Sequence, residues 1–138
     1  MVLILADGLG WEQLHALRAS GELPFIGSLL ARAERGDGAQ LLRATTIFPS
    51  TTTAAVTTVN TARTPQEHGN VAYFTWLEEF GAVAQMLRWG PAVHRRGSFF
   101  DDPAVDPRDF VKVRSLHARA SERGLRTYPI EPELFRNE

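Results

Sequence analysis

Three side chains of this 138-residue chain have the type and position of catalytic groups. They are the hydroxyls of Thr51 and Thr52 and the carboxylate of Asp7. Asp7 directly follows the apolar run 2–6, and the two threonines come just past the strand-like segment 40–47. Functional residues of a parallel sheet gather at the carboxyl ends of its strands. We therefore expect the carboxylate and the hydroxyls to meet at one edge of a sheet.

A threonine hydroxyl is inert at its ordinary pKa and becomes a nucleophile only with the help of a base or a metal ion. The first turn of a helix adds backbone N–H groups and a positive dipole end, which favour a phosphoryl group. A metal ion held by Asp7 would thus allow a threonine at the start of helix 51–61 to attack phosphorus. Taken singly, each residue also fits a plainer role, Asp7 in a turn and Thr51 or Thr52 as a helix cap.

The elements that would position these residues follow from the spacing of apolar side chains. Strands are predicted at 2–6, 40–47, 71–77, 82–89 and 125–130, and helices at 11–19, 23–35, 51–61 and 110–123. Residues 64–69 are predicted as a loop. This order is typical of an α/β layered fold with a mainly parallel sheet flanked by helices.

Composition narrows the function classes. The net charge of −1 gives no signal for binding nucleic acid or a membrane surface. Cysteine is absent, so any metal ion must be held by oxygen or imidazole. No signal peptide or membrane segment is visible, which favours a cytoplasmic location. No two histidines have metal-ligand spacing, and we expect structural roles for all four: His15, His68, His94 and His117.

Three short motifs stand in order along the chain. The run 2–6 ends in Asp7-Gly8, residues 48–52 read Phe-Pro-Ser-Thr-Thr, and residues 65–69 read Pro-Gln-Glu-His-Gly. Together they resemble the type I phosphodiesterase and nucleotide pyrophosphatase family of the alkaline phosphatase superfamily. Its second signature reads roughly F-P-[ST]-x-T, then a helix, then P-x-x-H-G. Counting from Pro49 or from His68 places the nucleophile of that pattern at Thr52 rather than Thr51.

The resemblance implies a hydrolase of phosphodiester or nucleotide pyrophosphate bonds that acts through a covalent phospho-threonine on Thr52. It implies two divalent metal ions, most often Zn²⁺ and alternatively Mn²⁺, one of them shared by Asp7 and Thr52. The backbone N–H of Thr53 would hold a phosphate oxygen. The substrate would be a small phosphodiester or a nucleotide; the oligomeric state stays open.

Three departures from the family pattern stand out. Ala55 occupies the position of a phosphate-binding asparagine, and Thr61-Ala62 replaces a Thr-Gly pair. The later metal ligands have no equivalent, since no correctly spaced histidine accompanies the aspartates Asp101, Asp102, Asp106 and Asp109. We therefore expect residues 1–138 to be the N-terminal part of a single, incomplete alkaline phosphatase-like catalytic domain, with weak metal binding and little activity alone.

Two other functions fit the same motifs. A phosphatase, sulfatase or phosphomutase of the superfamily would share the first aspartate and the nucleophile position, although a threonine nucleophile favours the diesterase branch. A non-catalytic α/β domain would bind an anion at the start of the Thr52 helix. The aromatic stretch 73–89 is interpreted as core rather than as an interaction patch or a lid.

Overall fold

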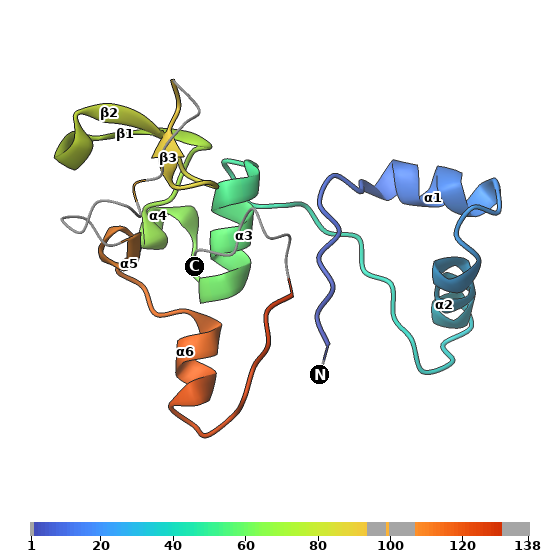
Figure 1. Ribbon diagram of the computed structural model, residues 1–138. Helices are drawn as coiled ribbons and strands as arrows, with labels where there is room; N and C mark the ends of the chain where they lie inside the picture. Colours follow the sequence, from blue (N-terminus) through green and yellow to red (C-terminus); the bar gives the residue numbers. More distant parts are fainter. Residues whose placement is uncertain (1, 94–98, 100–106, 131–138) are drawn as a thin grey trace. The chain divides into compact units, whose positions relative to one another are not determined.

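The computed structural model describes residues 2–93, 99 and 107–130 of the chain (Figure 1). These residues belong to two compact units, Met1–Thr45 and Thr46–Glu138. Each unit has its own internal packing.

The first unit contains two helices, α1 (Trp11–Ala19) and α2 (Pro24–Glu34). Both confirm the helices that the sequence predicts at 11–19 and 23–35. Pro24 stands in the first turn of α2, where a missing N–H costs nothing. A two-pronged ion pair joins the helices, with Arg18 Nη2 2.8 Å from Glu34 Oε2, and Leu30 is the buried residue of α2.

The strand predicted at 2–6 is wrong for this structure. Residues 2–6 have no regular secondary structure, and the exposed fractions are 84% for Val2, 68% for Leu3, 85% for Ile4 and 57% for Leu5. The strands predicted at 40–47 and 125–130 are absent in the same way. A strand exists only where a neighbour satisfies its N–H and C=O groups, and no described segment pairs with these three.

The second unit is built around α3 (Thr52–Thr61). A single turn, α4 (Pro65–His68), follows it where the sequence predicts a loop, because Thr64 and Glu67 form a capping box. The helix predicted at 110–123 is present only in part, as α6 (Leu116–Ser121), and the separate turn α5 (Pro107–Phe110) ends where that helix is predicted to begin. The Ser115 side chain sets the start of α6 by accepting the N–H of Ala118 at 3.1 Å.

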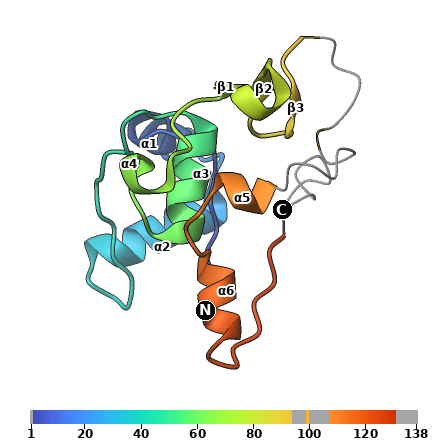
Figure 2. The ribbon, with the colours of Figure 1, turned by 90° about the vertical axis from the view of Figure 1, so that its left-hand side faces the viewer.

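The sheet of the second unit is antiparallel, which corrects the mainly parallel sheet predicted from the sequence. Its order is β1 (Phe74–Leu77), β2 (Ala82–Gln85), β3 (Gly90–Pro91), with Phe74 opposite Gln85. The 3₁₀ turn η1 (Glu78–Phe80) joins β1 to β2. So short a connection allows only antiparallel pairing, because a parallel pair needs a crossover of a dozen residues or more. Figures 1 and 2 show the sheet toward the N-terminal end of α3 and α6 toward its C-terminal end.

One face of this sheet builds the core of the second unit. Leu77 and Ala84 point into it with Met86 and Trp89, and aromatic side chains surround them: Phe80, Phe99 and Phe110. The rings of Phe80 and Phe99 stack with their centroids 4.0 Å apart. The opposite face leaves Phe74, Trp76 and Val83 exposed. The aromatic stretch is therefore core on one face of the hairpin only.

Candidate active site at the start of the central helix

Thr51 is the N-cap of α3. Its backbone is extended, with φ −76° and ψ 149°, and its Oγ1 accepts the N–H of Ala54 at 3.4 Å. Its carbonyl accepts the N–H of Ala55 at 2.9 Å, the first bond of the helix. Threonine suits this position because its oxygen satisfies an N–H group that the helix leaves without an acceptor.

Thr53 connects the start of α3 to the segment before β1. Its side chain is only 3% exposed, and its Oγ1 donates to the carbonyl of Ala72 at 2.9 Å. The hydroxyls of Thr51 and Thr53 lie 3.1 Å apart. Because the Thr53 proton is used on Ala72, Thr51 must donate to Thr53. The result is a directed relay from the Ala54 N–H through Thr51 and Thr53 to the Ala72 carbonyl.

Thr52, the predicted nucleophile, is the first residue of α3 and is half-buried. It stands between the two threonines whose hydroxyls form the relay. The N–H groups of Thr52 and Thr53 belong to the first turn, which has no intrahelical acceptors and carries the positive end of the dipole. The relay thus fixes a helix start that suits a negatively charged group.

Asp7 occupies an exposed turn of the first unit. Gly8 follows it with φ +75°, a conformation that favours glycine and explains the Asp-Gly pair. Because Thr52 belongs to the second unit, the metal site predicted to be shared by Asp7 and Thr52 stays a prediction.

Metal ligation needs more side chains than the described residues bring together. Within residues 2–93, 99 and 107–130, no group of three histidine, aspartate or glutamate side chains could hold a metal ion. Asp109 lies in α5, whereas Asp101, Asp102 and Asp106 lie outside the described residues. A complete metal site would therefore require ligands beyond these residues.

His68 has the structural role that the sequence predicts. Its ring is 2% exposed, its Nδ1 accepts the N–H of Asn70 at 3.1 Å, and its Nε2 lies 3.0 Å from Thr58 Oγ1. Since Nδ1 accepts, Nε2 carries the proton and the ring is neutral. Burial lowers the pKa of His68, while a backbone hydrogen bond to Ala54 and the charge of Glu67 oppose that shift.

Two of the other histidines, His15 and His117, are far from Thr52 in the sequence, and the third lies outside the described residues. His15 packs on the ring of Trp11 with centroids 4.5 Å apart, in the first unit. His117 Nδ1 contacts Thr127 Oγ1 at 2.8 Å. His94 lies outside the described residues.

Asn70 is a buried residue that the sequence argument missed. Its Nδ2 donates to Thr57 Oγ1 at 3.0 Å, so it ties the turn after α4 to the middle of α3. The sequence did carry one signal for this role, because Asn70 directly follows the His-Gly pair. Small polar residues in tight turns often form hydrogen bonds with nearby backbone or side chains.

The C-terminal end of α3 carries the substitution Thr61-Ala62 noted above. Ala62 adopts φ 52° and ψ 40°, a left-handed conformation, and its N–H bonds the Thr58 carbonyl at 2.8 Å. A residue that carries a Cβ is strained in this backbone conformation, which is why glycine is common at the end of a helix. Arg119 from α6 donates through Nη2 to the Thr61 carbonyl at 2.6 Å; no sequence signal links residues this far apart.

None of the helices among the described residues is long and apolar enough to cross a membrane.

The searches of curated proteins and of solved structures found no significant match. A family model described as type I phosphodiesterase / nucleotide pyrophosphatase matches residues 1–124. That family consists of hydrolases that are generally metal-dependent. Because its model matches most of the chain, this protein belongs to the type I phosphodiesterase / nucleotide pyrophosphatase family.

Proposed function

We propose that this chain carries the nucleophile of a metal-dependent hydrolase that cleaves phosphodiester or nucleotide pyrophosphate bonds in a small-molecule substrate. Thr52 is the nucleophile, and the intermediate is a covalent phospho-threonine. The hydroxyl relay at the start of α3 is the observation that supports this assignment most, because it gives Thr51 and Thr53 structural roles on either side of Thr52.

The relay favours Thr52 over its neighbours for a chemical reason. A nucleophile must give up its hydroxyl proton and reach the substrate. The Thr51 hydroxyl uses its proton on Thr53 and its oxygen on the Ala54 N–H, so ionising it would break the cap. The Thr53 hydroxyl is buried against Ala72. Thr52 is half-buried at the first position of the helix and three residues after Pro49, where the family pattern has its nucleophile.

In the proposed reaction, Thr52 Oγ1 bonds to phosphorus as the bond to the leaving oxygen breaks. Water then attacks the phospho-threonine and restores the hydroxyl. The backbone N–H of Thr53 and the helix dipole stabilise the charge that develops on the phosphoryl oxygens. Ala55 offers only a methyl group, so these backbone contributions carry more of that task than they would beside an asparagine.

Asp7 and the Thr52 oxygen would together hold one of two divalent metal ions, Zn²⁺ or alternatively Mn²⁺, and the other ligands would come from outside the described residues. Such ions, when bound, lower the pKa of a bound hydroxyl and neutralise a leaving oxygen. The exposed apolar side chains of residues 2–5 support a further element of the proposal: this segment becomes a strand when the sheet of an alkaline phosphatase-like domain is completed, and the chain alone has little activity.

Hydrolysis of bis(p-nitrophenyl) phosphate with Zn²⁺ or Mn²⁺ tests the assignment. The matched variants are Thr52→Ala and Thr51→Ala, with thermal unfolding measured on both. Activity that is lost in Thr52→Ala and kept in Thr51→Ala, despite a lower melting temperature, supports Thr52 as nucleophile. Activity that survives Thr52→Ala would rule it out.

Absence of activity in every variant of residues 1–138 supports the incomplete-domain element, and the same variants are then compared in a chain extended past Glu138. A p-nitrophenyl monoester and a sulfate ester run beside the diester separate the diesterase from a phosphatase or sulfatase. If the monoester or the sulfate ester is cleaved faster than the diester, the proposal of a phosphodiester substrate is contradicted.

A further inference from the structure

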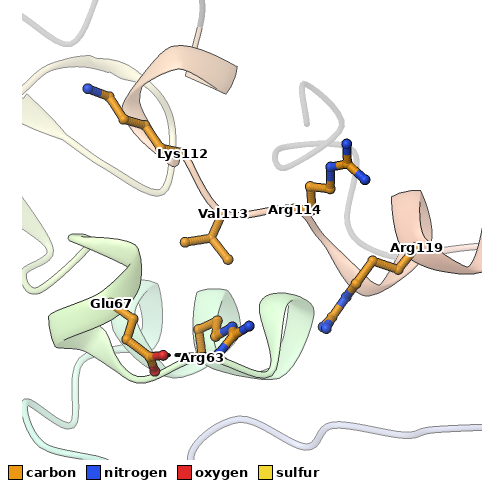
Figure 3. A pocket seen from close by; sticks show the side chains of 6 residues that line it. All are labelled: Arg63, Glu67, Lys112, Val113, Arg114 and Arg119. Carbon is orange, nitrogen blue, oxygen red and sulfur yellow. Dashed lines mark hydrogen bonds and ion pairs between the residues drawn. The ribbon is translucent and has the colours of Figure 1, made fainter.

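A pocket of about 420 Å³ lies beside the C-terminal end of α3, where the segment before α6 passes over it (Figure 3). Its lining contains four cationic side chains and a single carboxylate. The lining residues are Arg63, Glu67, Lys112, Val113, Arg114 and Arg119. The pocket therefore has an excess of positive charge.

Existing ion pairs neutralise only part of this charge. Arg63 Nη1 lies 3.1 Å from Glu67 Oε1, and Arg114 Nη1 lies 2.7 Å from Glu122. Lys112 has no ion pair within the described residues. Arg119 donates to the Thr61 carbonyl, which is a neutral acceptor, and its Nε is buried without a hydrogen-bond partner among these residues.

Glu67 is also engaged elsewhere. Its Oε2 accepts both the N–H and the hydroxyl of Thr64, each at 2.9 Å. These two bonds are the largest causes that lower the pKa of Glu67, ahead of its interactions with Arg63. The Glu67 carboxylate thus caps α4 and also pairs with the guanidinium of Arg63. Arg63 therefore keeps N–H groups for a further acceptor.

We propose that this pocket binds a phosphate-type oxyanion between the guanidinium groups of Arg63 and Arg119. Figure 3 shows these two groups pointing toward one another, below the Val113 side chain. Two cations so arranged repel each other, and an anion between them converts that repulsion into attraction. The planar fork of arginine matches two oxygens of a phosphate, and Val113 adds an apolar wall beside them.

Two features of the surroundings shape the site. The carbonyls at the end of α3 bring partial negative charge, which would oppose an anion, but the Arg119 bond to Thr61 neutralises part of it. The charged ends of Lys112 and Arg114 point away from Arg63 and Arg119 in Figure 3, so they contribute attraction at longer range rather than direct bonds.

The pocket is separate from the proposed nucleophile. Thr52 begins α3 and Thr61 ends it, which places about 15 Å of helix between the two ends. The ligand class is inorganic phosphate or pyrophosphate, or the phosphate group of a nucleotide. Binding here involves no residue of the Thr52 site and does not depend on hydrolysis.

Calorimetric titration of residues 1–138 with pyrophosphate and with phosphate, against chloride at equal ionic strength, tests the site. We expect saturable binding of both oxyanions that chloride does not reproduce. Arg63→Gln should weaken it about tenfold, the loss typical of one charge-assisted contact. Glu67→Gln should strengthen it, because that change removes a repelling charge and releases Arg63.

Arg123→Gln, on an exposed arginine that does not line the pocket, is the matched control and should bind like the unchanged chain. Thr52→Ala should also bind normally, which separates this site from the start of α3. Titrations of the nucleotide AMP and of ribose distinguish a nucleotide phosphate from the sugar alone. Equal affinities in Arg63→Gln and Arg123→Gln, or binding abolished by Thr52→Ala, would overturn the proposal, as would no binding beyond that of chloride.

Discussion

The His68 ring lies with its Nε2 3.0 Å from the Thr58 hydroxyl, and its other nitrogen accepts the N–H of Asn70. Through these two bonds the turn after α4 is held against the middle of α3. An imidazole can accept at one nitrogen and donate at the other only when it is neutral. The charge state of one histidine is therefore coupled to the packing of two helices.

The first prediction concerns pH. The pKa of His68 is lowered from its ordinary value of 6.5 in the folded chain, so the unfolded chain binds more protons between the two values. Its contribution to stability is fully present above about pH 6.5 and is lost as the pH falls through that value toward the lowered pKa. Urea unfolding between pH 8 and pH 5 should show this decline.

His68→Gln is the test variant and His117→Gln the control. The glutamine cannot titrate, so this part of the pH dependence should disappear, and the variant should lose about 1–3 kcal/mol at pH 8 from unpaired buried groups. His117→Gln should keep the decline below pH 6.5. The same slope in both variants would mean that His68 is not its source.

The second prediction concerns the cap of α3. Thr51→Ala removes the acceptor for the Ala54 N–H and the donor to Thr53, so it should lower the free energy of unfolding by about 1–2 kcal/mol. Thr51→Ser keeps the oxygen and should recover most of that loss. Thermal unfolding followed by circular dichroism measures both, and an alanine variant as stable as the serine variant would contradict the relay.

The third prediction is a stabilising change. Ala62 has a left-handed backbone, with φ 52°, that costs an alanine about 1–2 kcal/mol and a glycine almost nothing. After the greater freedom of glycine in the unfolded chain is subtracted, Ala62→Gly should stabilise by up to about 1 kcal/mol. Ala55→Gly, within α3, should destabilise by about 1 kcal/mol. Chemical denaturation should therefore give opposite signs for the same substitution seven positions apart.

The fourth prediction compares the two faces of the β1–β2 hairpin. Leu77 is 3% exposed in the aromatic core, whereas Val83 on the other face is 42% exposed. Leu77→Ala should cost about 2–4 kcal/mol through the cavity that it leaves, and Val83→Ala about 0.5 kcal/mol. Fluorescence of the tryptophans Trp76 and Trp89 reports both unfolding transitions, and equal losses would mean that the two faces are equally packed.

Helices α1, α2 and α3 could be predicted from the sequence because their signals are local. Thr51 caps α3, and Pro24 begins α2 within a residue of the predicted bound. The strands predicted at 2–6, 40–47 and 125–130 are absent, since a strand depends on partners that an apolar run does not specify. The antiparallel sheet depends instead on the short turn at Glu78–Phe80.

Local features of the candidate site could be predicted where residues close in sequence form them. The FPSTT motif places Thr52 at the start of a helix, as the structure confirms, while its role as nucleophile stays a prediction. The His-Gly turn indicates a backbone bond to the ring of His68, which the structure also confirms. Arg119 could not be found this way, because its bond to Thr61 joins residues 58 positions apart. The role of Asp7 stays a prediction for a related reason: it depends on contacts between segments distant in sequence.

The exposed apolar side chains of residues 2–5 also affect how the chain behaves in concentrated solution. An apolar, uncharged segment that contains β-branched residues and has unpaired backbone groups is a template on which a second copy can add a strand. Self-association of the purified chain should therefore begin here and grow with protein concentration and with salt. A single charged substitution, Ile4→Lys, should reduce light scattering without altering the unfolding of the second unit.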